Sequence, residues 1–162
     1  MTEEGVVLLT EKGFKRLSDE LAQLTGVRRP EIAERIRASK EQGEFADDNS
    51  EFEEAKREQA IVESRIAELK ELLSSAQKLS TRNIPTDRVG IGSVVVLRNL
   101  KKRSEKLEIR VVTVFEADPD EGSISSDSPW GQALMDRAVG DKVVINAPAG
   151  QLHYEILEIR KK

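Results

Sequence analysis

The chain has 162 residues, of which 35% are charged, 38% hydrophobic and 4% aromatic, with a formal net charge of −4 at pH 7. It contains no cysteine, which excludes disulfides and thiol chemistry and suits a reducing cytosol. Acidic residues outnumber basic ones in residues 1–80 and nearly equal them in residues 81–162, so neither half resembles a basic nucleic-acid-binding domain. With no signal peptide and no apolar run of about 18 residues, we expect a cytoplasmic protein without a membrane span.

The first forty residues predict an interrupted helix. The apolar run 5–9 favours a short strand or a packed arm, and Thr10 is a candidate N-cap for a helix that begins at Glu11. Gly26 and Pro30 interrupt the apolar pattern, which predicts a break at 26–29 and a second helical piece from 30 to about 42. The side chains expected to face a partner helix are Phe14, Leu17, Leu21, Leu24, Ile32, Ile36 and either Ser39 or Lys40.

A second helical arm follows, with a stronger coiled-coil pattern. Its apolar positions alternate in steps of three and four residues, the spacing that pairs two helices along a heptad seam. At ~1.5 Å per residue, an arm of about thirty residues extends about 45 Å. The seam positions are Phe52, Ala55, Gln59, Val62, Ile66, Leu69, Leu73 and Ala76.

The turn between the two arms, residues 41–54, is rich in carboxylates and lacks Lys and Arg. Carboxylate oxygens are ligands for hard cations such as Mg²⁺, but an exposed turn cannot supply the six ligands that Mg²⁺ demands. The turn could complete a metal site inside a partner protein, neutralise a basic patch there, or serve as a solubilising loop. Its acidic residues are Glu41, Glu44, Asp47, Asp48, Glu51, Glu53 and Glu54.

The second half predicts a small antiparallel sheet with one helix. Residues 80–88 have the composition of a linker, and residues 128–135 favour a short helix begun by Ser128 and Pro129. Turn residues at 118–122 and 149–150 separate the remaining apolar runs. The strands are expected at 93–97, 107–115, 123–125, 142–146 and 152–159. We therefore predict an α+β chain with a coiled-coil hairpin at 1–80 and a globular domain at 81–162.

The sequence provides little for independent catalysis. Its one histidine, His153, falls in a strand pattern, and a Ser-His-Asp or Cys-His arrangement has no second candidate base. Gly90 and Gly92 lack the third glycine and the following helix of a dinucleotide-binding fingerprint, and no phosphate loop is present. The chain is therefore not expected to be an enzyme with its own pocket, and no cofactor of its own is expected.

Several segments resemble a known family. They are LTEKGFKRLSDEL (9–21), VRRPEIAERI (27–36), the acidic turn, EFEEAKREQAIVESRIAELKELLSSAQ (51–77), GSVVVLRNL (92–100), SPWGQALM (128–135) and VGDKVVINAPAG (139–150). In this order they resemble the bacterial transcription elongation factors of the GreA type over nearly the whole chain. The resemblance implies an N-terminal coiled-coil hairpin and a C-terminal FKBP-like domain.

The resemblance also implies an activity on RNA polymerase. Factors of this family dock at the rim of the polymerase secondary channel and insert the hairpin, and the tip acids help to position a Mg²⁺ ion and the water that cleaves a backtracked transcript. It places Glu44 and Asp48 as metal-binding and catalytic residues, with Asp47 extra or sharing that role. Lys40 and Lys56 would contact the RNA 3′ end, and docking would involve Ser128, Pro129 and Trp130.

The tip departs from the family pattern, which reads Gly, Asp, Leu, Ser or Lys, Glu, Asn, Ala, Glu, Tyr. Here residues 43–52 read GEFADDNSEF, which is one residue longer, with Glu44 in place of the first acid and Asp48 in place of the second. The family includes homologues with more densely acidic tips that enter the channel and inhibit the polymerase. Channel-binding inhibition or pause control is therefore the alternative to cleavage. A third hypothesis is a structural coiled-coil adaptor with an isomerase-like domain. We expect a monomer, because the turn is short.

Overall fold

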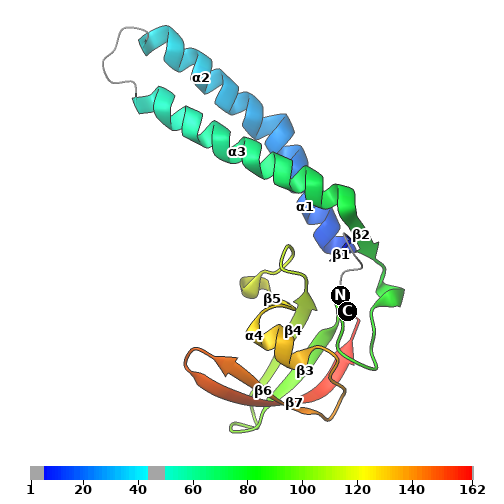
Figure 1. Cartoon of the computed structure of the whole chain (residues 1–162). Helices are drawn as coiled ribbons and strands as arrows, with labels where there is room; N and C mark the ends of the chain where they lie inside the picture. The colour runs from blue at the N-terminus through cyan, green and yellow to red at the C-terminus, as the bar shows by residue number, and fades with distance from the viewer. Residues whose placement is uncertain (1–5, 44–49, 162) are drawn as a thin grey trace. The chain divides into compact units, whose positions relative to one another are not determined.

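The computed structural model describes residues 6–43 and 50–161 and contains two compact units (Figure 1). One unit is the helical hairpin, residues 14–75, and the other joins the residues up to Gly13 to those from Ala76 onward. The α+β class is confirmed, with a helical hairpin in the first half and a curled sheet in the second. The boundary expected near residue 80 stays a prediction. In the residues described, no helix is long and apolar enough to cross a membrane.

A pair of short strands ties the beginning of the chain to the end of the hairpin. Strand β1 (Val7–Thr10) confirms the expected short strand and pairs in parallel with β2 (Ala76–Leu79). Strand β2 was not anticipated, since Ala76 was assigned to the helical seam. The register places Val7 opposite Ala76, and Leu9 is fully buried. Both ends of the hairpin are therefore held together by backbone hydrogen bonds.

Thr10 caps helix α1 (Glu11–Gln23) as the sequence predicts. The backbone N–H of Gly13 donates to Thr10 Oγ1 at 3.0 Å, which satisfies one of the free donors of the first turn. Thr10 in turn donates its N–H and its hydroxyl to the carboxylate of Glu116, which is 6% exposed. A buried carboxylate needs such donors, so Glu116 joins the start of α1 to the segment after β4.

The expected break at 26–29 takes the form of a π-helix. Residues Leu24–Arg28 form this segment, and α2 (Arg29–Gly43) continues directly from it. The backbone N–H of Arg29 donates to the carbonyl of Leu24, five residues back, and Pro30 follows as the second residue of α2. The chain thus stays helical through Gly26, and the proline occupies the first turn, where its missing N–H costs little.

The seam between the arms is confirmed in most positions. Helix α3 (Ser50–Ser75) buries Ala55, Val62, Ile66, Leu69 and Leu72. The last of these replaces the predicted Leu73, which is half-buried, because α3 ends at Ser75 and Ala76 enters β2. On the other arm Leu17, Ile32 and Ser39 are buried, while Lys40 is exposed.

The second unit is built on a five-stranded sheet with the order β5-β4-β3-β7-β6. All neighbours are antiparallel except β4 and β5, which are parallel; the connection between them contains a 3-10 turn at Pro119–Glu121. Each strand falls within a few residues of its predicted place. The bounds are β3 Val94–Asn99, β4 Lys106–Val112, β5 Ser123–Ser125, β6 Lys142–Ala147 and β7 Gly150–Arg160.

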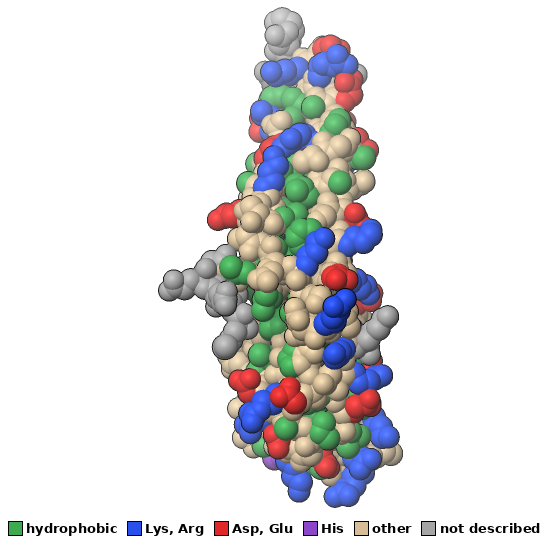
Figure 2. Space-filling model, turned by 90° about the vertical axis from the view of Figure 1, so that its right-hand side faces the viewer, with side chains coloured by type: hydrophobic (Ala, Val, Ile, Leu, Met, Phe, Trp, Pro, Cys, Tyr) green, Lys and Arg blue, Asp and Glu red, His purple; other side chains and the backbone are tan. Residues whose placement is uncertain are grey.

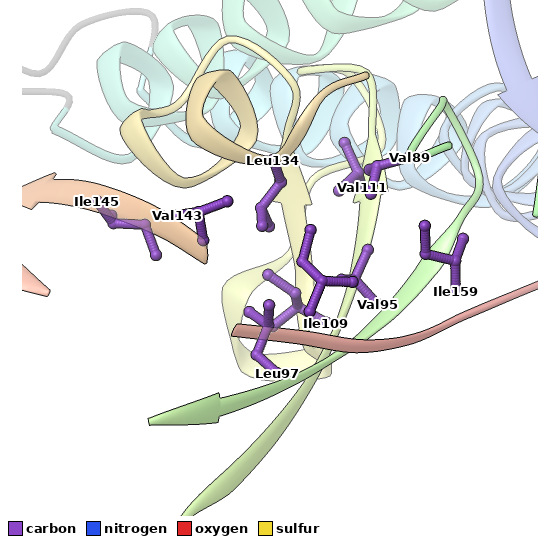
Figure 3. Close-up of a cluster of buried hydrophobic side chains, with 10 residues drawn as sticks. Val89, Val95, Leu97, Ile109, Val111, Leu134, Val143, Ile145 and Ile159 are labelled. Carbon is purple, nitrogen blue, oxygen red and sulfur yellow. The ribbon is translucent and has the colours of Figure 1, made fainter. Parts of the chain in front are cut away.

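Helix α4 (Pro129–Leu134) covers one face of this sheet. In Figure 3, Leu134 points from the helix toward side chains of the strands, among them Val95 and Ile109. Leu134, Val95, Leu97, Ile145 and Ile156 are each 0% exposed, so the core lies between α4 and the sheet. Burial of each such side chain contributes about 1.5–3 kcal/mol, which is the main source of stability in this unit.

Candidate functional site

The acidic turn predicted as the functional tip is flanked by the two long helices. Helix α2 ends at Gly43 and α3 begins at Ser50 (Figure 1). Glu44, Asp47 and Asp48 fall between these ends and lie outside the described residues. The flanking acids Glu41, Glu51, Glu53 and Glu54 are all exposed. The helices therefore bring both ends of an acidic segment to the same end of the hairpin.

Small buried side chains characterise the part of the hairpin nearest this turn. Ser39 on α2 is 7% exposed and Ala55 on α3 is 0% exposed, and Phe52 is half-buried. Small residues on facing helices let their backbones approach closely. Further along, Ile32, Val62 and Ile66 form a buried cluster, against which the partly buried Leu21, Leu24 and Ile36 pack. The buried side chains of both arms therefore hold α2 and α3 in a defined arrangement on either side of the residues that flank the turn.

Ion pairs join the two arms across this apolar seam. Glu58 Oε2 on α3 accepts from Arg28 Nη2 at 2.6 Å and from Arg35 Nη1 at 2.8 Å. Arg29 and Glu63 form a two-pronged pair at 2.7 and 2.8 Å. Single exposed pairs contribute at most about 1 kcal/mol. These pairs therefore add little to the stability of the hairpin. Their two-pronged geometry and shared partners instead restrict the rotation and register of one arm against the other.

The Arg29–Glu63 pair gives a pH prediction. The Arg29 hydrogen bonds lower the pKa of the Glu63 carboxyl, and the same pair raises the pKa of Arg29. Because the Glu63 pKa is lower in the folded state, the pair stabilises the fold at pH values above the unfolded-state pKa of about 4.3. This stabilisation is lost as the pH falls through the folded-state pKa. Arg29→Ala is therefore expected to raise the Glu63 pKa toward its ordinary range, measured by NMR titration of its side chain. An unchanged Glu63 midpoint would contradict the pairing.

The predicted RNA-contacting lysines flank the turn on opposite arms. Lys40 is exposed in the last turn of α2, and Lys56 is exposed in the second turn of α3, where its Nζ lies 3.4 Å from Gln59 Oε1. On the face shown in Figure 2, Lys and Arg side chains are scattered with acidic ones between them. The two lysines are thus positioned by the same helices as the acidic turn.

The predicted docking residues begin helix α4. Ser128 Oγ accepts from the backbone N–H of Gly131 at 3.1 Å and donates to the carbonyl of Ser125 at 2.6 Å, so its side chain is engaged in the cap. The Trp130 ring lies 5.3 Å from that of Tyr154 and packs against the core. Pro129 is exposed.

Chemistry outside the turn is sparse in the part of the chain that the structure describes. It holds no group of three or more His, Cys, Asp or Glu side chains able to bind a metal ion. His153 lies half-buried in β7 opposite Val144 of β6, as expected for a strand residue. The Glu58 pairs and the buried Glu116 were not predicted from the sequence. The seven-residue spacing of Arg28 and Arg35 places both on one face of the arm and could have indicated a shared partner. Nothing in the sequence around Glu116 indicates that its side chain is buried.

Comparison with known proteins covers nearly the whole chain. Residues 84–161 match the family model described as "Transcription elongation factor, GreA/GreB, C-term", and residues 7–77 match "Transcription elongation factor, N-terminal". The chain is 44% identical over 153 residues to transcription elongation factor GreA of Chlorobium phaeovibrioides, covering 94% of this chain and 96% of the relative. It is 42% identical over 155 residues to GreA of Thermoanaerobacter pseudethanolicus, covering 96% and 98%.

Solved structures are also similar over most of their length. The crystal structure of GreA factor homolog 1 from Thermus thermophilus is 32% identical, with a TM-score of 0.45, and the match covers 96% of this chain and 99% of that one.

Proposed function

This chain belongs to the GreA/GreB family of transcription elongation factors, and we propose that it enters the secondary channel of RNA polymerase and stimulates cleavage of backtracked transcripts. The matches to both family models and the identity to GreA relatives confirm the resemblance found in the sequence. The factor itself is proposed to act as an accessory to the polymerase active site, as a monomer and in the cytoplasm.

The proposal rests on a helical hairpin whose two arms are joined by a buried seam and by ion pairs, and whose arms are connected by an acidic segment free of Lys and Arg. The seam and the ion pairs of Glu58 and Glu63 join the two arms, and beyond these contacts α2 continues to Gly43 and α3 begins at Ser50. Glu44 and Asp48 lie in the segment between them, with Asp47 extra or sharing their role. Carboxylate oxygens carried at the end of a helical hairpin suit a partner's metal site, because they are the usual protein ligands of hard cations.

The donor set of the turn fits Mg²⁺ in its chemistry, since carboxylates are its usual protein ligands. We assign Glu44 and Asp48 to hold the ion jointly with the polymerase. When bound, Mg²⁺ would polarise a water molecule for attack on the RNA phosphodiester. The other tip carboxylates add negative charge around this position. Lys40 and Lys56 are proposed to contact phosphates at the RNA 3′ end.

The second candidate function is inhibition of the polymerase from within the same channel. It is favoured by the adjacent acids Asp47 and Asp48 and by the extra residue of the turn, because metal sites are sensitive to ligand displacements of about 0.2 Å. An isomerase-like adaptor is weaker, since such a pocket needs an aromatic lining, whereas Trp130 packs on Tyr154 and Phe115 is 46% exposed.

A backtracked polymerase complex distinguishes these functions. The full-length protein is added to the stalled complex with labelled RNA, and the length of the transcript is followed over time. We expect RNA shortening from the 3′ end, followed by resumed synthesis. Slower synthesis without shortening would favour the inhibitor, and no effect on either quantity would contradict both functions in the channel.

A further inference from the structure

Positive charge is concentrated in the turn between β3 and β4, which we call the basic turn. Its residues, 98–106, read RNLKKRSEK and contain five Lys or Arg residues and one acid, although the whole chain has a net charge of −4. Residues 101–106 are all exposed. The turn lies at the opposite end of β3 from Arg160, the last residue of β7, which pairs with the first residue of β3 (Figure 1).

Asn99 gives the basic turn a defined backbone. Its Oδ1 accepts from the backbone N–H groups of Lys101 and Lys102, at 2.9 and 3.2 Å. Backbone hydrogen bonds from Asn99 to Glu105 and from Glu105 to Lys102 close the turn. The carboxylate of Glu105 accepts from Asn99 Nδ2 at 3.5 Å and lies 3.7 Å from Lys102 Nζ. The one acid of the turn is therefore engaged within it.

The other cationic side chains of the basic turn have no partner among the described residues. They are Arg98, Lys101, Arg103 and Lys106. Arg98 lies in the central strand β3, half-buried, and its Nε is buried without a hydrogen-bond partner. The register places it opposite Lys106 of β4 on one side and Glu155 of β7 on the other. Like charges on directly opposite strand positions repel, and a bound anion would offset this repulsion.

The composition of the basic turn favours a phosphate backbone over a protein as its partner. Residues 101–106 contain no apolar side chain, whereas protein interfaces have an apolar core that is rich in aromatic residues and poor in Lys. Lys and Arg are the usual ligands of nucleic-acid phosphates. Single strands are bound largely by stacking on aromatic rings, but Trp130 and Tyr154 pack against the core of the sheet unit. A duplex therefore fits this surface better than a single strand.

We propose that the basic turn binds the phosphate backbone of duplex DNA independently of its sequence. The phosphate-binding side chains are Arg98, Lys101, Arg103 and Lys106. The choice of DNA rests on the proposed function, because a transcribing polymerase holds duplex DNA. The site lies in the sheet unit and is separate from the predicted RNA contacts Lys40 and Lys56 on the hairpin.

The test measures binding of the full-length protein to a short fluorescent DNA duplex by anisotropy at several salt concentrations. The wild-type protein is expected to bind duplexes of unrelated sequence equally, and more weakly as the salt concentration rises. Lys101→Glu combined with Arg103→Glu is expected to weaken binding by about 10-fold or more at low salt. It should also reduce the slope of log K against log salt by about 2, one for each lost phosphate contact.

Arg137→Glu combined with Lys161→Glu is the matched control. Both residues are exposed in the same unit, and the pair changes the net charge by the same amount. Its affinity for the duplex should stay near that of the wild-type protein. Cooperative melting at an unchanged temperature in both double variants checks that the sheet unit remains folded. Arg98→Gln, a single change, should lower the salt slope by about 1.

Equal losses of affinity in the two double variants would overturn the inference, because only the overall charge would then matter. It would also be overturned if the wild-type protein did not bind the duplex at low salt, or if it bound a polyglutamate peptide in preference, as a site for an acidic protein would. The assay contains no polymerase. Transcript cleavage without DNA binding would therefore remove this site and leave the proposed function, and the reverse result would leave the site alone.

Discussion

Replacing Asp48 or Glu44 with alanine is expected to abolish transcript shortening while binding to RNA polymerase persists. Each substitution removes an oxygen ligand from a metal site to which the chain contributes one or two ligands. The cleavage rate is therefore expected to fall, while the affinity for the polymerase is expected to change little. A loss of about 100-fold or more in the cleavage rate is expected for one catalytic ligand. The measurement is the rate of RNA shortening at saturating factor, with polymerase affinity determined separately by competition.

Asp47→Ala and Glu53→Ala are the matched controls for this prediction. Asp47 is the additional acid of the longer turn, and an intermediate loss would show that it shares the metal-binding role. Glu53 is exposed on α3 beside the turn, and its removal should leave the cleavage rate unchanged. Normal cleavage by both Asp48→Ala and Glu44→Ala would show that the tip residues are assigned wrongly.

Gly131→Ala is expected to destabilise the sheet unit by about 3 kcal/mol. A Cβ at this position would lie 2.1 Å from the carbonyl oxygen of Ser125 and 2.6 Å from the Cα of Ser126. Both atoms belong to backbone, which cannot rotate away as a flexible side chain does. Helix α4 must therefore move outward and expose Leu134, which is otherwise 0% exposed. Urea unfolding of the purified variant measures the change in the free energy of unfolding.

The same substitution is expected to weaken polymerase binding, because α4 carries Pro129, which is predicted to take part in docking. Gln132→Ala is the control, since Gln132 is exposed on the same short helix and its truncation leaves the contact with Ser125 intact. It should change stability by less than about 0.5 kcal/mol. Equal unfolding midpoints for Gly131→Ala and Gln132→Ala would contradict the close approach of α4 to the turn at 125–126.

Periodicity accounts for the parts of the fold that could be predicted. Val62, Ile66 and Leu69 recur at the spacing of a helical seam, and Val143 and Ile145 alternate as strand residues do, so burial follows from the sequence alone. The N-caps Thr10 and Ser128 were predictable for a similar reason, since they act within three residues of themselves.

Long-range pairing accounts for what could not be predicted. Strand β2 has the sequence AQKL, which has little strand propensity, and it exists because β1, which precedes the whole hairpin in the chain, pairs with it. Glu116 is buried because Thr10 supplies its donors from a segment that lies more than a hundred residues earlier in the chain. The break at 26–29 takes the form of the π-helix Leu24–Arg28 only in the packed hairpin, and local patterns do not contain the packing of its neighbours against α3.

The parallel pairing of β1 with β2 has a consequence for dividing the gene into fragments. A fragment that begins at residue 81 would lack both strands and would leave Glu116 without the N–H and hydroxyl of Thr10. A fragment of residues 14–75 would keep the seam and the ion pairs between the arms but would lose the strand pair that closes its base. Expression of the globular half alone therefore requires that residues 6–13 and 76–80 be supplied, for example through a short linker that replaces the arms.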